Sequence, residues 1–202
     1  YDFWQARKDS DNKWSASWGN GISMDDYGIY NYGLSTRGSG FAFLAGLIWP
    51  DELEKGEINH ALVFNTPNTK SGGPVSPDTD SDGITDEEWV LPEGALVRLD
   101  PDLDLGSFNL TDAEMTIAKA LQIYGMYLAD TGSESGVALY AVDPRSVQTN
   151  PYFEFFGNEA FPILSHIPVE KLQVIKLSPQ NENWEKSLKI EKNRCAAFSS
   201  GT

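Results

Sequence analysis

Short stretches of alternating apolar and polar residues recur along this chain, and residues that favour turns separate them. The clearest stretch is residues 13–19 (KWSASWG), in which Trp14 and Trp18 fall on one face of an extended strand. Residues 9–12 (DSDN) are typical of a turn, and they connect this stretch to a similar one at residues 1–8. We therefore expect an N-terminal hairpin and a β-rich fold.

Two helices are predicted from the signals at their ends. Residues 49–56 (WPDELEKG) begin with a proline where a first-turn amide needs no partner, continue with acids and end at a glycine. Residues 111–114 (TDAE) match a capping box, which predicts a helix that runs to about Gln122. Further strands are expected at residues 57–67, 93–99, 126–129, 137–142 and 168–176. We expect the segments at 126–129 and 137–142 to form a second hairpin.

Many short strands, frequent turns and one clearly signalled helix favour a β-sandwich. We predict a mainly β chain, an antiparallel β-sandwich of jelly-roll type with one or two short helices. Residues 1–202 form one domain in this interpretation, and residues 177–202 form an extended tail.

The chain carries a strong negative charge. Thirty acidic side chains against fifteen basic ones give a formal net charge of −15 at pH 7. A field of this sign repels nucleic-acid phosphates and anionic lipids, and the longest apolar runs are too short to span a membrane. We therefore expect neither a nucleic-acid partner nor membrane insertion. Cys195 is the single cysteine, so no internal disulfide can form.

Six motifs follow one another in order: DFWQAR (2–7), WSASWG (14–19), LAGLI (44–48), EINHAL (57–62), SDG (81–83) and RLDP (98–101). Together they resemble a largely uncharacterised family of secreted microbial β-rich proteins. The resemblance implies secretion and a longer precursor with a further N-terminal region, and it implies no particular activity. The strand-like start of the chain leads to the same expectation of an upstream segment. Asp2 stands where the family pattern has glutamate.

The sequence DTDSDGITD is similar to a calcium-binding loop. Asp78, Asp80, Asp82 and Asp86 occupy its first, third, fifth and ninth positions. Calcium takes about six to eight oxygen ligands, which alternating carboxylates around a glycine bend can supply. The twelfth position, where a bidentate glutamate is usual, is Trp89, so another acid would have to close the site. We predict a structural Ca²⁺ here; the alternative is a solvated acidic loop.

His60 is a candidate catalytic residue because a histidine can exchange a proton near neutral pH. It falls on the more apolar face of the predicted strand at residues 57–67. With Arg98 to neutralise a sugar carboxylate and a tyrosine as acid, it would suit a polysaccharide lyase. The alternative is a hydrogen-bonded core histidine. We interpret His166 as structural.

Asp2 is a second catalytic candidate, as one carboxylate of a glycosidase pair beside an aromatic platform. Its partner cannot be chosen from the sequence, although Asp82 and Asp130 are candidates. The alternative is an acid at the surface end of a strand. Two histidines and one cysteine are too few for the usual zinc sites, and no serine-hydrolase elbow is present.

Flat aromatic side chains with polar neighbours favour sugar binding. We predict that Trp4, Gln5, Trp18, Tyr30 and Tyr32 contact a polysaccharide or glycan. The leading hypothesis is therefore a secreted, extracellular carbohydrate-active or carbohydrate-binding β-sandwich, a lyase or glycoside hydrolase if it is an enzyme. The alternative hypothesis is a non-enzymatic extracellular structural or lectin-like subunit, stabilised by calcium and completed by an upstream fragment or a neighbouring chain.

Overall fold

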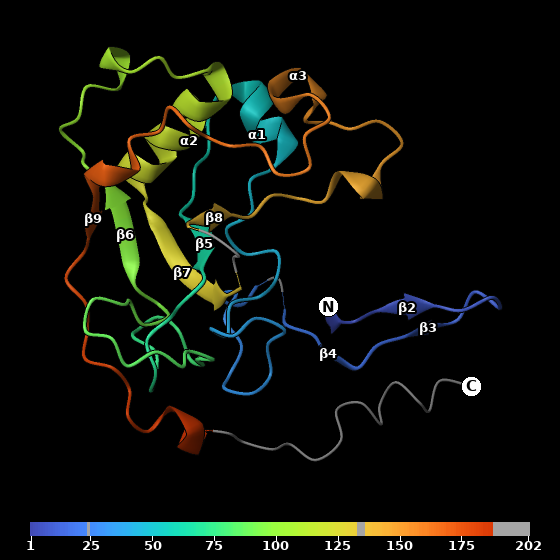
Figure 1. Cartoon of the computed structure of the whole chain (residues 1–202). Helices are drawn as coiled ribbons and strands as arrows, with labels where there is room; N and C mark the ends of the chain where they lie inside the picture. The colour runs from blue at the N-terminus through green and yellow to red at the C-terminus, as the bar shows by residue number, and fades with distance from the viewer. Residues whose placement is uncertain (24, 133–135, 188–202) are drawn as a thin grey trace.

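The structure is a computed structural model that describes residues 1–23, 25–132 and 136–187. It contains a five-stranded sheet with the strand order β8-β5-β7-β6-β9 (Figure 1). β5 and β7 run parallel, whereas the other neighbouring strands are antiparallel. The strands are β5 (Leu62–Thr66), β6 (Leu96–Leu99), β7 (Met126–Thr131), β8 (Ala138–Leu139) and β9 (Leu172–Val174).

The N-terminal hairpin is confirmed, and it extends away from the sheet (Figure 1). Its strands are β1 (Asp2–Trp4), β2 (Arg7–Lys8), β3 (Trp14–Ser15) and β4 (Trp18–Asn20). β1 pairs with β4 and β2 with β3, because Gln5 takes a positive φ of 53° and interrupts the first arm. At the tip, Asp9 Oδ1 accepts hydrogen bonds from the backbone amides of Asp11 and Lys13, which is the predicted turn chemistry.

Both predicted helices are present, as α1 (Pro50–Lys55) and α2 (Asp112–Ile123), together with a short α3 (Phe153–Phe156). In α2 the Thr111 hydroxyl accepts from the Glu114 amide, and the Glu114 carboxylate accepts from the Thr111 amide. The predicted capping box is therefore formed. Short 3₁₀ helices lie at Leu105–Ser107, Pro144–Ser146, Val169–Lys171 and Trp184–Ser187.

The predicted β-rich fold with few helices is confirmed, but the sheet is mixed, so the prediction of purely antiparallel strands is wrong at β5 and β7. The predicted hairpin of residues 126–129 with 137–142 is also wrong. β8 pairs with β5 instead, with Leu139 opposite Phe64, because β7 is already flanked by β5 and β6. Apart from this sheet, the described residues form two two-stranded ladders and no second sheet that would close a sandwich.

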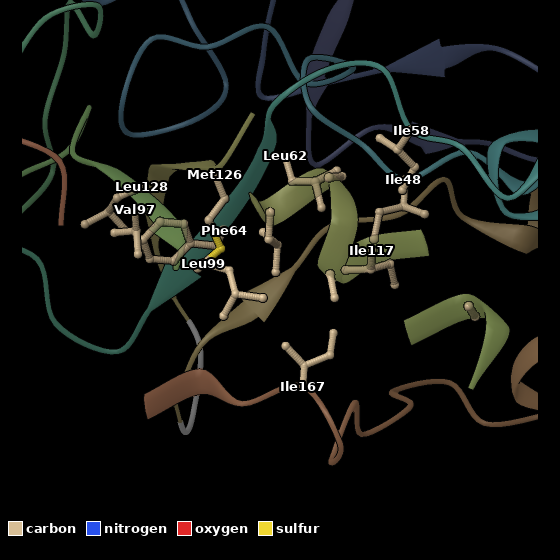
Figure 2. Close-up of a cluster of buried hydrophobic side chains, with 14 of the residues drawn as sticks. Ile48, Ile58, Leu62, Phe64, Val97, Leu99, Ile117, Met126, Leu128 and Ile167 are labelled. Carbon is tan, nitrogen blue, oxygen red and sulfur yellow. The ribbon is translucent and has the colours of Figure 1, made fainter. Parts of the chain in front are cut away.

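Helix α2 and the sheet enclose the main core (Figure 2). Alternation along the strands directs one set of side chains to this core. Its members include Leu62, Phe64, Val97, Leu99, Met126 and Leu128 from the strands and Ile117 from α2. The capped helix therefore lies against the face to which every second strand residue points.

A smaller cluster covers the opposite face of the sheet. Val63 of β5 and Ala129 of β7 point to this side and contact Phe41 from the loop before α1. The loop approaches the strand closely, since a Cβ on Gly46 would lie 2.6 Å from Val63 Cγ1, and Gly46 has a φ of 70°. Both faces of β5 and β7 are therefore buried, one under a helix and the other under a loop.

The predicted tail begins at residue 177, and the structure describes it up to residue 187. In this range it is docked against the rest of the protein. The side-chain amide of Gln180 donates hydrogen bonds through Nε2 to the carbonyls of Ser71 and Gly73. Residues 188–202, including Cys195, lie outside the described residues. Of the helices in the described ranges, none is both long and apolar enough to span a membrane.

Two isoleucines on α2 provide a test of this packing. Ile117 is 1% exposed and Ile123 is 64% exposed. We expect Ile117→Ala to lower the free energy of unfolding by about 2–5 kcal/mol through lost burial and a residual cavity. The matched control Ile123→Ala should change it by less than about 0.5 kcal/mol. Urea denaturation measures both values, and equal losses would contradict the assigned helix face.

Candidate functional site

Two tryptophans border an open hollow at the base of the hairpin. Trp4 of β1 and Trp18 of β4 are directly opposite each other in the ladder, and they are 55% and 43% exposed. With Gly33, Ser35 and Thr36 they line a hollow of about 350 Å³. We call these five residues the aromatic hollow. Two exposed indoles from paired strands offer an apolar surface with polar groups at its edge.

The other predicted sugar contacts lie elsewhere. Gln5 accepts a hydrogen bond from Ser17 Oγ (2.6 Å) on the hairpin. Tyr32 contacts Trp184 edge to face, with ring centroids 4.8 Å apart. Tyr30 is only 3% exposed, so it is a core residue rather than a surface one. Burial, with the nearby charge of Asp2, raises the pKa of the Tyr30 phenol to about 12.

The three predicted catalytic residues lie in three places. Asp2 is buried, and its Oδ2 accepts a hydrogen bond from the Phe43 amide (2.8 Å). His60 precedes β5 instead of lying on it, and its Nε2 is 2.9 Å from Glu52 Oε1 of α1. Arg98 lies on β6, opposite a residue of β9. Within the described ranges, no hydrogen bond or ion pair joins any two of the three, so the structure does not assemble the expected base and cation.

His166 also has a structural partner, in agreement with its interpretation from the sequence. Its Nδ1 is 2.9 Å from Glu114 Oε2, and its backbone amide donates to Glu114 Oε1. The carboxylate that caps α2 therefore also holds the segment that carries His166.

Three carboxylates from distant parts of the chain converge beside the sheet. One oxygen each of Asp82, Glu93 and Asp130 lies within 4.8 Å of the other two. Asp82 belongs to the predicted calcium loop, Glu93 shortly precedes β6, and Asp130 is near the end of β7. We call these three residues the acid cluster. Asp82 is exposed, Asp130 is half-buried and Glu93 is fully buried, so the cluster leads from the surface into the interior.

Neighbouring groups hold the acid cluster in place. Thr131 Oγ1 donates to Asp82 Oδ1 (2.7 Å), and the Asp82 amide donates to Glu93 Oε2 (3.3 Å). Tyr140 donates its hydroxyl to Asp130 Oδ2 (3.3 Å). The backbone of Gly38 also hydrogen-bonds Asp130 and passes against Asp82, since a Cβ on Gly38 would lie 2.5 Å from the Asp82 carboxyl carbon.

Burial makes these acids hard to ionise. It raises the pKa of Glu93 to about 10, and the charges of Asp82, Asp78 and Asp130 act in the same direction. Burial also raises the pKa of Asp78 to about 9, although the charge of Arg37 opposes this shift. The pKa of Asp130 is raised by burial and by the charge of Asp82. The region therefore concentrates carboxyl groups in an environment that disfavours their charge.

Arg37 is a buried cation whose charge acts on Asp78 and Asp130, but its guanidinium is directed to backbone carbonyls. Its Nη1 donates to Ala45 O (3.0 Å) and its Nη2 to Phe43 O (2.8 Å). The guanidinium also lies over the ring of Tyr140, 4.8 Å from the centroid. Arg37 therefore holds the loop before α1 and offsets only part of the negative charge.

The four predicted calcium ligands do not converge as one loop. Asp80 accepts from the amides of Gly33 and Ser81, and Asp86 accepts from the Ser71 hydroxyl. Asp78 is buried, and of these four acids only Asp82 belongs to the acid cluster. Asp80 and Asp86 therefore accept hydrogen bonds that hold the loop in its conformation.

Sequence reasoning missed Glu93, Arg37 and Gly38. It named Asp130 only as a possible glycosidase carboxylate. No local signal marks this combination, because the converging acids are separated by 11 and 37 positions along the chain (93 − 82 and 130 − 93).

Comparisons with protein-family models, with curated proteins and with solved structures found no match to this chain.

Asp78 gives a pH-dependent test of this electrostatic environment. Because its folded pKa of about 9 is above its ordinary value of 3.8, the native state binds more protons than the unfolded state between these limits. Its contribution to stability therefore falls as pH rises from about 4 to about 9. In chelator-containing buffer, we compare the free energy of unfolding of Asp78→Asn with that of wild type. This difference should shift in favour of the variant by on the order of 2 kcal/mol between pH 5 and pH 8.

Urea denaturation at the two pH values measures this difference. The control is Asp86→Asn, which alters an exposed acid of the same loop and should follow the pH dependence of the wild-type protein. If Asp78→Asn also parallels wild type, the carboxyl of Asp78 does not titrate as its burial requires.

Proposed function

We propose that this protein is a secreted glycan-binding module that holds a polysaccharide against Trp4 and Trp18. The observation that carries the proposal is the aromatic hollow, which the exposed indoles of two paired residues line beside a polar backbone segment. The apolar faces of sugar rings stack on such surfaces, and the surrounding polar groups can bind hydroxyls. Secretion is part of the proposal and is supported by the resemblance of the six sequence motifs.

Binding is favoured over catalysis by the positions of the candidate catalytic groups. Asp2 is buried against Phe43 and Tyr30, and His60 is paired with Glu52. Neither residue lines the aromatic hollow. A general acid or base has to reach the bond that it cleaves, so we assign Asp2 and His60 to the support of the fold.

A second candidate function is that of a subunit whose hairpin is covered by another chain or an upstream segment. It is favoured by the exposure of both faces of the hairpin. Phe3, on the other face of β1 from Trp4, is 61% exposed, and Trp14, near the tip, is 69% exposed. In this alternative, added strands would extend the β structure towards the jelly-roll sandwich that the sequence favours. Light scattering tests the case of cover by another chain, because a glycan-binding module can act as a monomer whereas a hairpin covered by another chain requires a stable complex.

Substitution of the two tryptophans tests the glycan proposal. Affinity electrophoresis through gels that contain soluble neutral and acidic polysaccharides should show retardation of the wild-type protein by at least one of them. Trp4→Ala and Trp18→Ala should each weaken this binding about fivefold to tenfold, because each removes a stacking surface.

The matched control is Trp14→Ala. Trp14 is an exposed tryptophan of the same hairpin that contacts Lys8 and does not line the hollow. This variant should bind like wild type. Equal losses in all three variants, or no retardation of wild type by any polysaccharide, would contradict the proposal.

A further inference from the structure

We propose that Asp82, Glu93 and Asp130 bind one divalent cation, and that this cation is calcium. This site differs from the calcium loop expected from the sequence, since its ligands come from that loop, from the segment before β6 and from β7. It is also separate from the aromatic hollow, with which it shares no residue.

The spacing of the carboxylates fits one ion. The three oxygens lie within 4.8 Å of one another. Calcium–oxygen bonds are about 2.3–2.6 Å long, so two ligands on opposite sides of the ion are about 5 Å apart and adjacent ligands are closer. One calcium ion can therefore contact all three carboxylates with only small movements of side chains.

Glu93 provides a second, independent indication of a ligand. Its side chain is 0% exposed, and its Oε1 has no hydrogen-bond partner among the described residues. Burying a polar atom without a partner is costly, and a bound cation would remove that cost. Asn65 Oδ1 is likewise buried without a partner in the part of the chain that the structure describes, and Asn65 is opposite Asp130 in the β5–β7 ladder.

The concentration of carboxyl groups around the acid cluster also favours a bound cation. Asp78 and Glu93 are buried and Asp130 is half-buried. The charges of Asp82, Asp78 and Asp130 all act on Glu93. Arg37 is a buried cation whose charge acts on Asp78 and Asp130. Both terminal nitrogens of Arg37 donate to backbone carbonyls. If the three carboxyl groups of the acid cluster ionise together, their negative charge exceeds what one guanidinium can offset, and a divalent ion between them would balance that charge.

The chemistry of the donors selects the ion. All three are carboxylates, and no histidine or cysteine belongs to the group, which favours Ca²⁺ or Mg²⁺ over zinc or copper. Magnesium requires a nearly ideal octahedron, whereas calcium accepts irregular coordination. Ligands from two loops and a strand suit the more tolerant ion. The exposure of Asp82 gives the ion a path from solvent.

Differential scanning fluorimetry of the whole chain, first treated with EDTA and then dialysed, tests the proposal. Adding CaCl₂ should raise the Tm saturably, by about 4 °C or more once calcium is in hundredfold excess over its Kd. MgCl₂ at the same concentration should raise it less. A Tm that neither ion changes would overturn the proposal, and an equal shift with magnesium would overturn the assignment to calcium.

Two isosteric variants and a control locate the ion. Glu93→Gln and Asp130→Asn should each abolish the calcium-dependent rise in Tm. Asp86→Asn should keep it, because Asp86 lies in the same loop as Asp82 but outside the acid cluster. Circular dichroism establishes that each variant is folded. If Glu93→Gln does not fold, Asp130→Asn alone decides, since Asp130 is only half-buried. A calcium shift that persists in a folded Asp130→Asn protein, or that is lost in Asp86→Asn, overturns the proposal.

Discussion

The parallel pairing of β5 with β7 is the constraint on which the remaining structure depends. Parallel neighbours cannot be joined by a tight turn, so the chain must leave the sheet and return. The intervening residues supply the acidic loop, β6 and helix α2 before β7 lies beside β5. Both strands are buried on both faces. A shift of the pairing by one residue would move the side chains of each face to the other cluster, so the register is strongly specified. That register places Asn65 opposite Asp130.

The same ladder delivers the acids to their place. The register shifts between Phe64 and Asn65, where the buried hydrophobic run ends and polar residues begin. Past that irregularity, Asp130 and Thr131 face the acidic loop, and Thr131 bonds to Asp82. Buried carboxyl groups with strongly raised pKa values oppose folding at neutral pH, and groups of this kind are concentrated at functional sites.

Local signals predicted the elements whose causes are local. The capping box of Thr111 and Glu114 marked α2, and the turn at Asp9 marked the hairpin. Pairing between distant strands has no such signature: β8 is two residues long, and its choice of β5 depends on which sheet edge is free. The aromatic hollow was half predicted, through Trp4 and Trp18. The acid cluster was not predicted, because Glu93 becomes buried only when the sheet has formed, and no local sequence pattern marks that burial.

One backbone segment, residues 33–38, touches both the aromatic hollow and the acid cluster. Ser35 and Thr36 line the hollow, and Gly38, two residues later, is in contact with Asp82 and bonds to Asp130. This segment is a physical connection through which a movement of those carboxylates could alter the surface beside the indoles. Thermodynamic reciprocity then requires that occupancy of either place alter affinity at the other by the same factor. Coupling of this kind would make the affinity for a glycan depend on the calcium concentration of the surroundings.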